Sequence, residues 1–144
     1  MNSREQELNQ ALEAMHFGFR AMVYKPDQRL AKLAYSRIHH RILYFIGRNN
    51  DCSVNELLKI LGVSKQYLNR PLKKLLADGY IQQQADKHDR RIKRLCLTNT
   101  GNQLEQELTG DQRRRFAEIF DQVGPEAELH WREVMLLLAG QIGF

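Results

Sequence analysis

The sequence lacks the features that mark several large classes of protein. Its 144 residues include no apolar run of about 18, so we expect no membrane-spanning helix. Only two cysteines are present, Cys52 and Cys96, and residues 1–7 are polar, without the apolar stretch of a signal peptide. These features predict a cytoplasmic protein, where a reducing environment keeps both cysteines as thiols.

Motifs of catalysis and of metal binding are also missing. The chain has no glycine-rich phosphate loop, no GxSxG motif, and no CxxC or HExxH spacing. We therefore expect neither an enzyme nor a bound cofactor or metal. One alternative stays open, a metal-responsive regulator that uses His39, His40 or a cysteine, although an isolated histidine is more often a helix or core residue.

What the sequence does contain is an ordinary globular balance with its positive charge in one place. Charged residues make up 27% and hydrophobic residues 42%, which excludes a disordered chain. Residues 64–94 hold nine Lys or Arg and three Asp, a net charge of +6, whereas the whole chain carries +5. Such a block is expected of a protein that binds nucleic acid, and also of a solvated basic surface.

Helical periodicity dominates both ends of the chain. Apolar residues at steps of three and four predict a helix over residues 5–24, which Pro26 should end, and a second helix over residues 28–48. Thr98 should begin a long helix, and Pro125 the last one. The first helix carries Leu8, Leu12, Met15, Phe19 and Met22, and the buried candidates of the last are Trp131, Val134, Met135 and Leu138.

Residues 53–79 carry start and stop signals for two short helices. Ser53 and Glu56 have the spacing of a capping box, in which each side chain accepts a hydrogen bond from a free backbone N–H of the first turn. Gly62 suits the end of that helix, Ser64 can cap the next one, and Gly79 can end it. The spacing predicts a helix-turn-helix.

The second of these helices, residues 64–78, has the two faces of a helix that reads DNA. Its leucines predict a buried side, and long polar side chains on the other side can hydrogen-bond base edges in the major groove. Pro71 lies inside it, where we expect it to be tolerated or to bend the axis. The candidate DNA contacts are Ser64, Lys65, Gln66, Asn69, Arg70 and Lys73.

A β-hairpin is predicted next, from strands at residues 80–84 and 92–97 with a charged turn between them. Its tip lies at about residues 87–90, within the basic block. A basic hairpin beside a helix-turn-helix favours DNA binding over an ordinary solvent face. The candidate contacts on this hairpin are Lys87, Asp89, Arg90 and Arg91; Cys52 is expected in the turn before the first short helix.

This part of the chain resembles the MarR-type regulators. The run Asp89-Arg90-Arg91, then Leu95-Cys96-Leu97-Thr98, then Gly101, is similar to the wing signature of that family, and Leu76-Ala77-Asp78-Gly79-Tyr80-Ile81 is similar to the exit of its recognition helix. The resemblance implies that Arg91 enters the minor groove and that Asp89 helps to hold the wing. Narrow minor grooves attract arginine, so this role is physically reasonable.

The resemblance also implies an architecture. We expect a mainly α fold with a small β-hairpin wing, a winged helix-turn-helix flanked by N- and C-terminal dimerisation helices. Residues 1–144 would form a single MarR-type domain, with the DNA-binding lobe at 28–98 and dimerisation helices at 5–24 and 99–144. Redox-sensing members of the family use a cysteine near the first helix; residues 1–51 have none, so that mechanism is not expected.

The implied function is a transcriptional regulator, a repressor that binds a pseudo-palindromic operator in double-stranded DNA as a homodimer. Many family members are released by a small aromatic or phenolic anion, and five residues combine aromatic surface with possible anion partners: His16, Phe17, Arg20, Tyr35 and His39. The same residues are equally compatible with packing at a helix junction. A winged-helix module that binds only proteins stays open as the alternative function.

Overall fold

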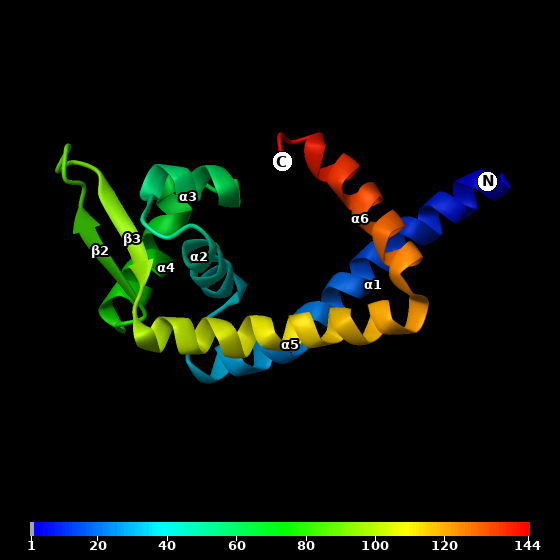
Figure 1. The fold of residues 1–144 in the computed structure, drawn as a ribbon, viewed down its shortest axis with the longest axis horizontal. Helices are drawn as coiled ribbons and strands as arrows, with labels where there is room; N and C mark the ends of the chain where they lie inside the picture. The colour runs from blue at the N-terminus through cyan, green and yellow to red at the C-terminus, as the bar shows by residue number, and fades with distance from the viewer. Residues whose placement is uncertain (1) are drawn as a thin grey trace. The chain divides into compact units, whose positions relative to one another are not determined.

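The computed structural model describes residues 2–144 and is mainly helical with one small sheet (Figure 1). The expected fold class is confirmed. The helices are α1 (Ser3–Lys32), α2 (Arg37–Arg48), α3 (Val54–Leu61), α4 (Lys65–Ala77), α5 (Asn99–Val123) and α6 (Pro125–Gly140). The strands β1 (Cys52–Ser53), β2 (Ile81–Ala85) and β3 (Lys93–Leu97) form an antiparallel sheet in the order β1-β3-β2.

The chain divides into two compact units, Met1–Gly110 and Asp111–Phe144, so the boundary falls within α5. Of the helices in residues 2–144, none is both long and apolar enough to cross a membrane. The first unit contains the sheet and the buried core.

The expected end of the first helix at Pro26 is wrong. α1 continues through this proline to Lys32, and the residues expected to begin a second helix at position 28 belong to α1 instead. Val23, Pro26 and Leu30 are the buried residues of α1, at steps of three and four. Their burial on one side of the helix compensates for the backbone hydrogen bond that the proline ring removes.

The break between α1 and α2 comes eight residues later than the proline. Ala34 adopts a left-handed conformation (φ 58°), and the Tyr35 N–H donates to the carbonyl of Leu30 (2.9 Å), which ends α1. Ser36 then caps α2, and its own N–H donates to Nδ1 of His39 (2.9 Å). Histidine here takes the part that Glu or Gln usually plays in a capping box.

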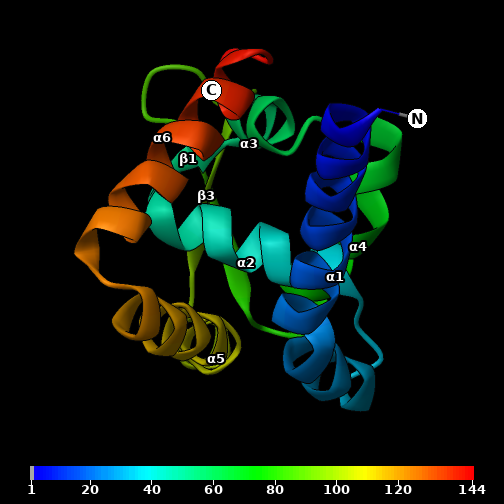
Figure 2. The ribbon, with the colours of Figure 1, turned by 90° about the vertical axis from the view of Figure 1, so that its right-hand side faces the viewer.

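The core gathers around α2, which contacts α1, α3, α4 and β3 and lies in the middle of these elements (Figure 2). We call residues 30–108, which span this core, the core lobe. Side chains from five helices and β3 are fully buried in it: Leu30, Ile42, Leu43, Ile46, Leu57, Leu68, Leu75, Leu95 and Leu108. This packing holds the helix-turn-helix and the sheet as one body.

The signals predicted for the helix-turn-helix are confirmed. Ser53 Oγ accepts a hydrogen bond from the Glu56 N–H (3.0 Å), and Ser64 Oγ accepts one from the Tyr67 N–H (3.1 Å). Gly62 ends α3 in the left-handed conformation (φ 66°). α4 runs through Pro71, which is buried, so the helix tolerates the proline.

β1 is not expected from the sequence, and Cys52 does not lie in a turn. Cys52 pairs with Leu95 and Ser53 with Arg94, so two residues before α3 become an edge of the sheet, and the Cys52 side chain is buried. A strand of two residues is too short to show the alternation by which strands are recognised in a sequence. β2 and β3 form the expected hairpin, which we call the wing (residues 81–97).

The start of α5 is fixed by two contacts at the base of the wing. Thr98 Oγ1 donates to the Gly79 carbonyl (2.6 Å) and accepts from the Gly101 N–H (3.0 Å). A Cβ atom at Gly101 would lie 1.9 Å from the Tyr80 carbonyl oxygen. Only glycine allows α5 to pass this close to the backbone of Tyr80, directly before β2.

In the second unit, rings of Phe116 and Phe120 on α5 pack against Trp131 on α6, with centroids 5.2–5.5 Å apart. The expectation that α6 carries buried residues does not hold within one chain. None of its residues is buried, and Trp131, Val134 and Leu138 are exposed. A helix with one helical neighbour can cover only a narrow stripe of its apolar surface.

Candidate nucleic-acid interface

α4 presents the two faces predicted for a recognition helix. Leu68, Leu72 and Leu75 are buried in the core, and Leu76 packs against it. All six candidate residues are exposed: Ser64, Lys65, Gln66, Asn69, Arg70 and Lys73. Because buried leucines recur at steps of three and four, these polar side chains share the opposite side of the helix, where a single surface can meet them.

The turn of the wing is organised by Asp86, which the sequence pattern does not single out. Its carboxylate accepts hydrogen bonds from the backbone N–H groups of His88 (2.9 Å) and Asp89 (3.0 Å), and from Nε of Arg94 (3.0 Å). The His88 N–H, together with Arg94 and the Asp89 N–H, holds the pKa of Asp86 below its ordinary value. The carboxylate therefore stays charged and keeps the turn in one shape.

Asp89 holds Arg91 at the tip of the wing. Arg91 donates from Nε to Oδ1 (3.0 Å), from a terminal nitrogen to Oδ2 (3.0 Å), and from its backbone N–H to Oδ1 (3.1 Å). The hydrogen bonds of Arg91 hold the pKa of Asp89 below its ordinary value. The Arg91 side chain is still 91% exposed, so the pair fixes its direction and leaves its outer surface free. Lys87 and Arg90 are exposed beside it.

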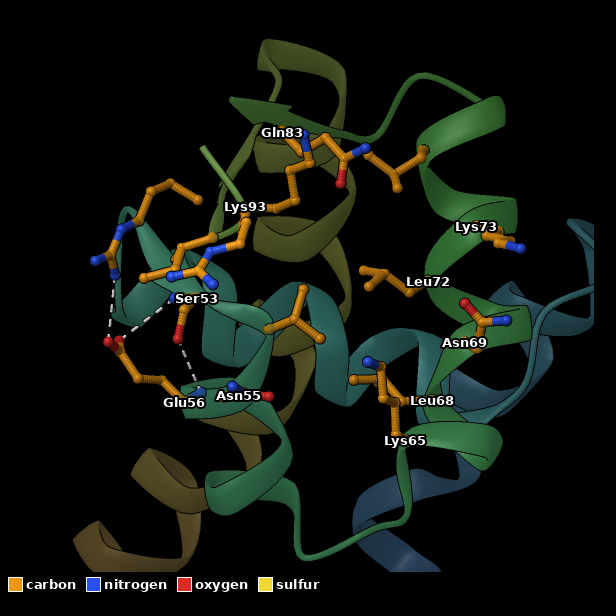
Figure 3. A pocket seen from close by; sticks show the side chains of 15 residues that line it. Ser53, Asn55, Glu56, Lys65, Leu68, Asn69, Leu72, Lys73, Gln83 and Lys93 are labelled. Carbon is orange, nitrogen blue, oxygen red and sulfur yellow. Dashed lines mark hydrogen bonds and ion pairs between the residues drawn. The ribbon is translucent and has the colours of Figure 1, made fainter. Parts of the chain in front are cut away.

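A groove of about 440 Å³, which we call the wing groove, separates α4 from the wing. Figure 3 shows Lys65, Asn69 and Lys73 on the α4 side and Gln83 and Lys93 on the strand side. The N-terminal end of α3 completes the wall with Ser53, Asn55 and Glu56. Cations on both sides of one groove form a suitable binding surface for a chain of phosphates.

Arg94 joins the wing to α3 on the side of this groove away from α4. Besides its hydrogen bond to Asp86, it donates to Oε1 of Glu56 (3.3 Å). Glu56 also accepts a weak hydrogen bond from the Ser53 N–H (3.4 Å), so one carboxylate caps α3 and anchors the wing arginine. The sequence indicates Arg94 only as part of the basic block, because a cross-element contact leaves no trace in local spacing.

The C-terminal end of α4 is anchored to the junction of α1 and α2. The Tyr35 hydroxyl donates to Asp78 (2.5 Å), and Lys74 Nζ pairs with the same carboxylate (3.2 Å). The Tyr35 ring stacks on His39, with centroids 4.5 Å apart. Burial, and then the Asp78 carboxylate, raise the pKa of the Tyr35 hydroxyl well above its ordinary value, so the hydroxyl keeps the proton that it donates to Asp78.

The five residues expected at an anion site fall into two groups. His16, Phe17 and Arg20 are exposed on α1, where the His16 ring meets the Phe17 ring edge-on and Arg20 lies 5.8 Å from the Phe17 centroid. Tyr35 and His39 are buried at the helix junction, and burial lowers the pKa of His39. Arg20 and Tyr35 are separated by more than three turns of α1, and an anion site from all five stays a prediction.

His40 and the cysteines also have defined surroundings. His40 Nε2 lies 3.0 Å from Thr109 Oγ1 on α5, and burial lowers its pKa. Cys52 and Cys96 are free thiols, and burial raises the pKa of Cys52. Among residues 2–144, no three His, Cys, Asp or Glu side chains gather closely enough to hold a metal ion.

Comparisons with known proteins agree with this fold. A model of the MarR family matches residues 35–92. The chain is 37% identical over 131 residues to the HTH-type transcriptional regulator PetP of Rhodobacter capsulatus, which covers 91% of this chain and 79% of that protein. It is 31% identical over 91 residues to the HTH-type transcriptional regulator BilQ of Clostridium symbiosum, covering 59% of this chain and 63% of that one.

A solved structure shares the fold as well. FabT of Streptococcus pneumoniae, in complex with DNA, aligns with a TM-score of 0.78 at 21% identity and covers 96% of each chain. At this identity the likeness shows the fold alone, whereas the PetP match extends over nearly the whole sequence. The chain belongs to the MarR family.

Proposed function

We propose that the protein is a sequence-specific transcriptional regulator that binds double-stranded DNA with α4 in the major groove and the wing in the minor groove. The observation that carries this proposal is the wing groove, in which exposed cations of α4 face those of β3 across a space open to solvent. DNA is a polyanion, and a strand of its phosphate backbone separates the major groove from the minor groove. That strand would lie in the wing groove, with α4 in the major groove on one side and the wing in the minor groove on the other. The PetP relative, a transcriptional regulator by name, supports the same conclusion.

The proposed active form is a homodimer. Leu8, Leu12 and Met15 of α1 are exposed, as are Leu136 and Leu137 of α6, although all are large and apolar. Burial against a second copy would remove them from water, as proposed from the sequence for residues 5–24 and 99–144. A two-fold dimer would then bind a pseudo-palindromic operator with half-sites about one helical turn apart.

Selection from random duplex DNA tests the proposal. We expect one near-palindromic motif to be enriched at moderate salt, with affinity falling steeply as salt rises.

Arg70→Ala should change base preference and cost roughly 1–3 kcal/mol if Arg70 makes a bidentate base contact. Arg91→Ala should weaken binding to many sequences alike. If no motif is enriched, a protein-binding winged-helix module becomes the better conclusion.

We further propose that the regulator represses transcription and is released by a small aromatic anion. The cluster of His16, Phe17 and Arg20 on α1 offers a ring and cationic or hydrogen-bonding partners for such a ligand. An anion that prefers a spacing of the two recognition helices that does not match successive grooves of DNA would weaken DNA binding. The size of the effect is set by the difference between the anion's affinities for the two states. Thermal shift with phenolic acids, followed by DNA titration, tests this; no stabilisation and no change in DNA affinity would remove its support.

A further inference from the structure

α4 has a second flank, on the side away from the wing groove. Lys65 and Asn69 line the wing groove, and Tyr67 lies between them in sequence. Tyr67 is two positions from each of them, and two positions turn a helical side chain by about 200°. Tyr67 therefore projects from nearly the opposite side of α4. Tyr67 is 56% exposed and lines a separate hollow of about 420 Å³, which we call the α2 hollow.

The α2 hollow is lined by Asp27 of α1, by residues 35–38 and Arg41 at the start of α2, and by Tyr67 in the first turn of α4. Arg37 and Arg41, one helical turn apart on α2, are both exposed beside Tyr67 and Ser36. Arg37 donates from Nε to both oxygens of Asp27 on α1 (3.0 and 3.3 Å), and its guanidinium lies 5.4 Å from the Phe19 ring centroid. In the part of the chain that the structure describes, Arg41 enters no ion pair.

Arg37, like Arg91 in the wing, donates to an aspartate, although it does so from Nε alone. In each case an aspartate accepts hydrogen bonds from the guanidinium, and the arginine remains exposed: the side chain of Arg37 is 47% accessible. A carboxylate that orients an arginine without covering it leaves the remaining N–H donors fixed toward solvent. Arg41 adds an uncompensated positive charge, and the Tyr67 and Ser36 hydroxyls add donors of the kind that contact phosphates.

We propose that the α2 hollow is a second phosphate-binding site for duplex DNA, in which Arg41, Arg37 and Tyr67 contact the strand on the far side of the major groove from the wing. The site rests on the proposed function. A major groove about 12 Å wide holds one helix, so backbone ridges run along both flanks of that helix. The wing groove meets one ridge, and the α2 hollow stands where the other ridge passes. Contacts on both ridges fix how deeply α4 enters the groove.

The test compares Arg41→Gln with Arg48→Gln, a change of the same charge on the same helix at an exposed position that is not part of the hollow. Affinity for the selected operator and for an unrelated duplex is measured at several salt concentrations. For Arg41→Gln we expect an affinity loss of roughly tenfold on both duplexes at about 0.1 M salt. The salt slope, which is the slope of the logarithm of the binding constant against the logarithm of the salt concentration, should be shallower by about 0.9 for each phosphate that the variant fails to neutralise. Arg48→Gln should keep the parent's affinity and slope.

Arg41→Lys separates charge from structure, since lysine restores the positive charge without the guanidinium. We expect it to recover the parent's salt slope and most of its affinity, with the same enriched motif. The inference is overturned if Arg41→Gln binds as the parent does, or no more weakly than Arg48→Gln, while Arg91→Ala still weakens binding. If the parent chain binds no duplex at all, the proposed function fails instead.

Discussion

The core lobe and the terminal helix use their apolar residues in opposite ways. In the core lobe, nine large side chains are fully buried, and the surface of α4 carries polar and charged groups. In α6 no residue is buried, and the exposed side chains of Val134, Leu136 and Leu137 are 62–77% accessible. The N-terminal turns of α1 resemble α6, since Leu8 and Leu12 are also exposed.

The difference separates folding from assembly. The core lobe completes its core from its own chain, so its helix ends, wing and exposed cations have fixed places in a single molecule. Large apolar side chains are exposed along both α1 and α6, and clusters of such side chains on a protein surface often mark an interaction site. Contacts within one chain therefore shape the core lobe, whereas in the proposed homodimer changes in α6 would act through the second copy.

The largest effect is expected where backbone packs on backbone. Gly101→Ala places a Cβ 1.9 Å from the Tyr80 carbonyl oxygen, and no side-chain rotation can relieve that overlap. We expect a destabilisation of about 3 kcal/mol in urea unfolding, and loss of DNA binding as α5 moves away from the base of the wing.

Gly18→Ala is the matched control, because a Cβ at this helical glycine of α1 would meet nothing within 4 Å in one chain. We expect it to stabilise α1 by up to about 1 kcal/mol. A destabilising Gly18→Ala would place the partner copy's backbone against this position. A neutral Gly101→Ala would contradict the close approach of α5 to the Tyr80 carbonyl.

The next effect concerns assembly. Leu137→Asp adds a charge at the most exposed leucine of α6, 77% accessible in one chain. Sedimentation at micromolar concentration should show two chains per particle for the parent and one for the variant, with operator affinity reduced because one half-site contributes alone. Glu133→Gln, on the same helix, should keep the two-chain particle. A parent that sediments as one chain and still binds its operator tightly would contradict the dimer.

A smaller effect is expected from the wing. Asp86→Asn removes the negative charge that Arg94 meets and weakens the acceptor for two backbone N–H groups of the turn. We expect weaker binding to all duplexes, by less than Arg91→Ala causes, with an unchanged thermal unfolding midpoint. Asp51→Asn is the control, since it changes the same charge in an exposed turn where Asn tolerates the positive φ of 64°. Equal affinities for the two variants would show that Asp86 does not shape the interface.

Local signals are enough to predict the helix-turn-helix. Ser53, Gly62 and Ser64 act through their own and adjacent backbone groups, and each lies where its side chain or φ is needed. The end of α1 escapes prediction because Pro26 is a strong local signal that burial overrides, while the true break depends on Ala34, whose left-handed backbone has no marker in the sequence.

Interactions between elements escape prediction for a different reason. Arg94 meets Glu56 from 38 positions away, and spacing along the chain carries no information about such a pair. The role of Asp86 is easier to predict from sequence. An aspartate often forms a turn by accepting hydrogen bonds from the backbone N–H groups two and three residues later, as Asp86 does from His88 and Asp89. The burial of Trp131 and Leu138 is inferred from periodicity, which shows that a helix has an apolar face but not which chain covers it.

The smallest effect tests whether the anchor at the end of α4 belongs to the core lobe. Tyr35→Phe removes the hydroxyl that donates to Asp78, and leaves the ring stacked on His39. Because Asp78 is exposed to solvent, we expect a loss of only about 1 kcal/mol at neutral pH in urea unfolding. Tyr24→Phe, at a tyrosine of α1 that is 61% exposed, should change nothing.

Two further measurements make the anchor falsifiable. The hydrogen bond from Tyr35 lowers the pKa of Asp78, so its stabilisation is present above the ordinary aspartate pKa and is lost as pH falls through the lower value of the folded state. The difference between parent and Tyr35→Phe should therefore shrink in acid. A double-mutant cycle with Asp78→Ala should assign most of the loss to the pair at neutral pH. If the two losses simply add, Tyr35 stabilises the lobe through its ring, and the hydroxyl does not hold the end of α4.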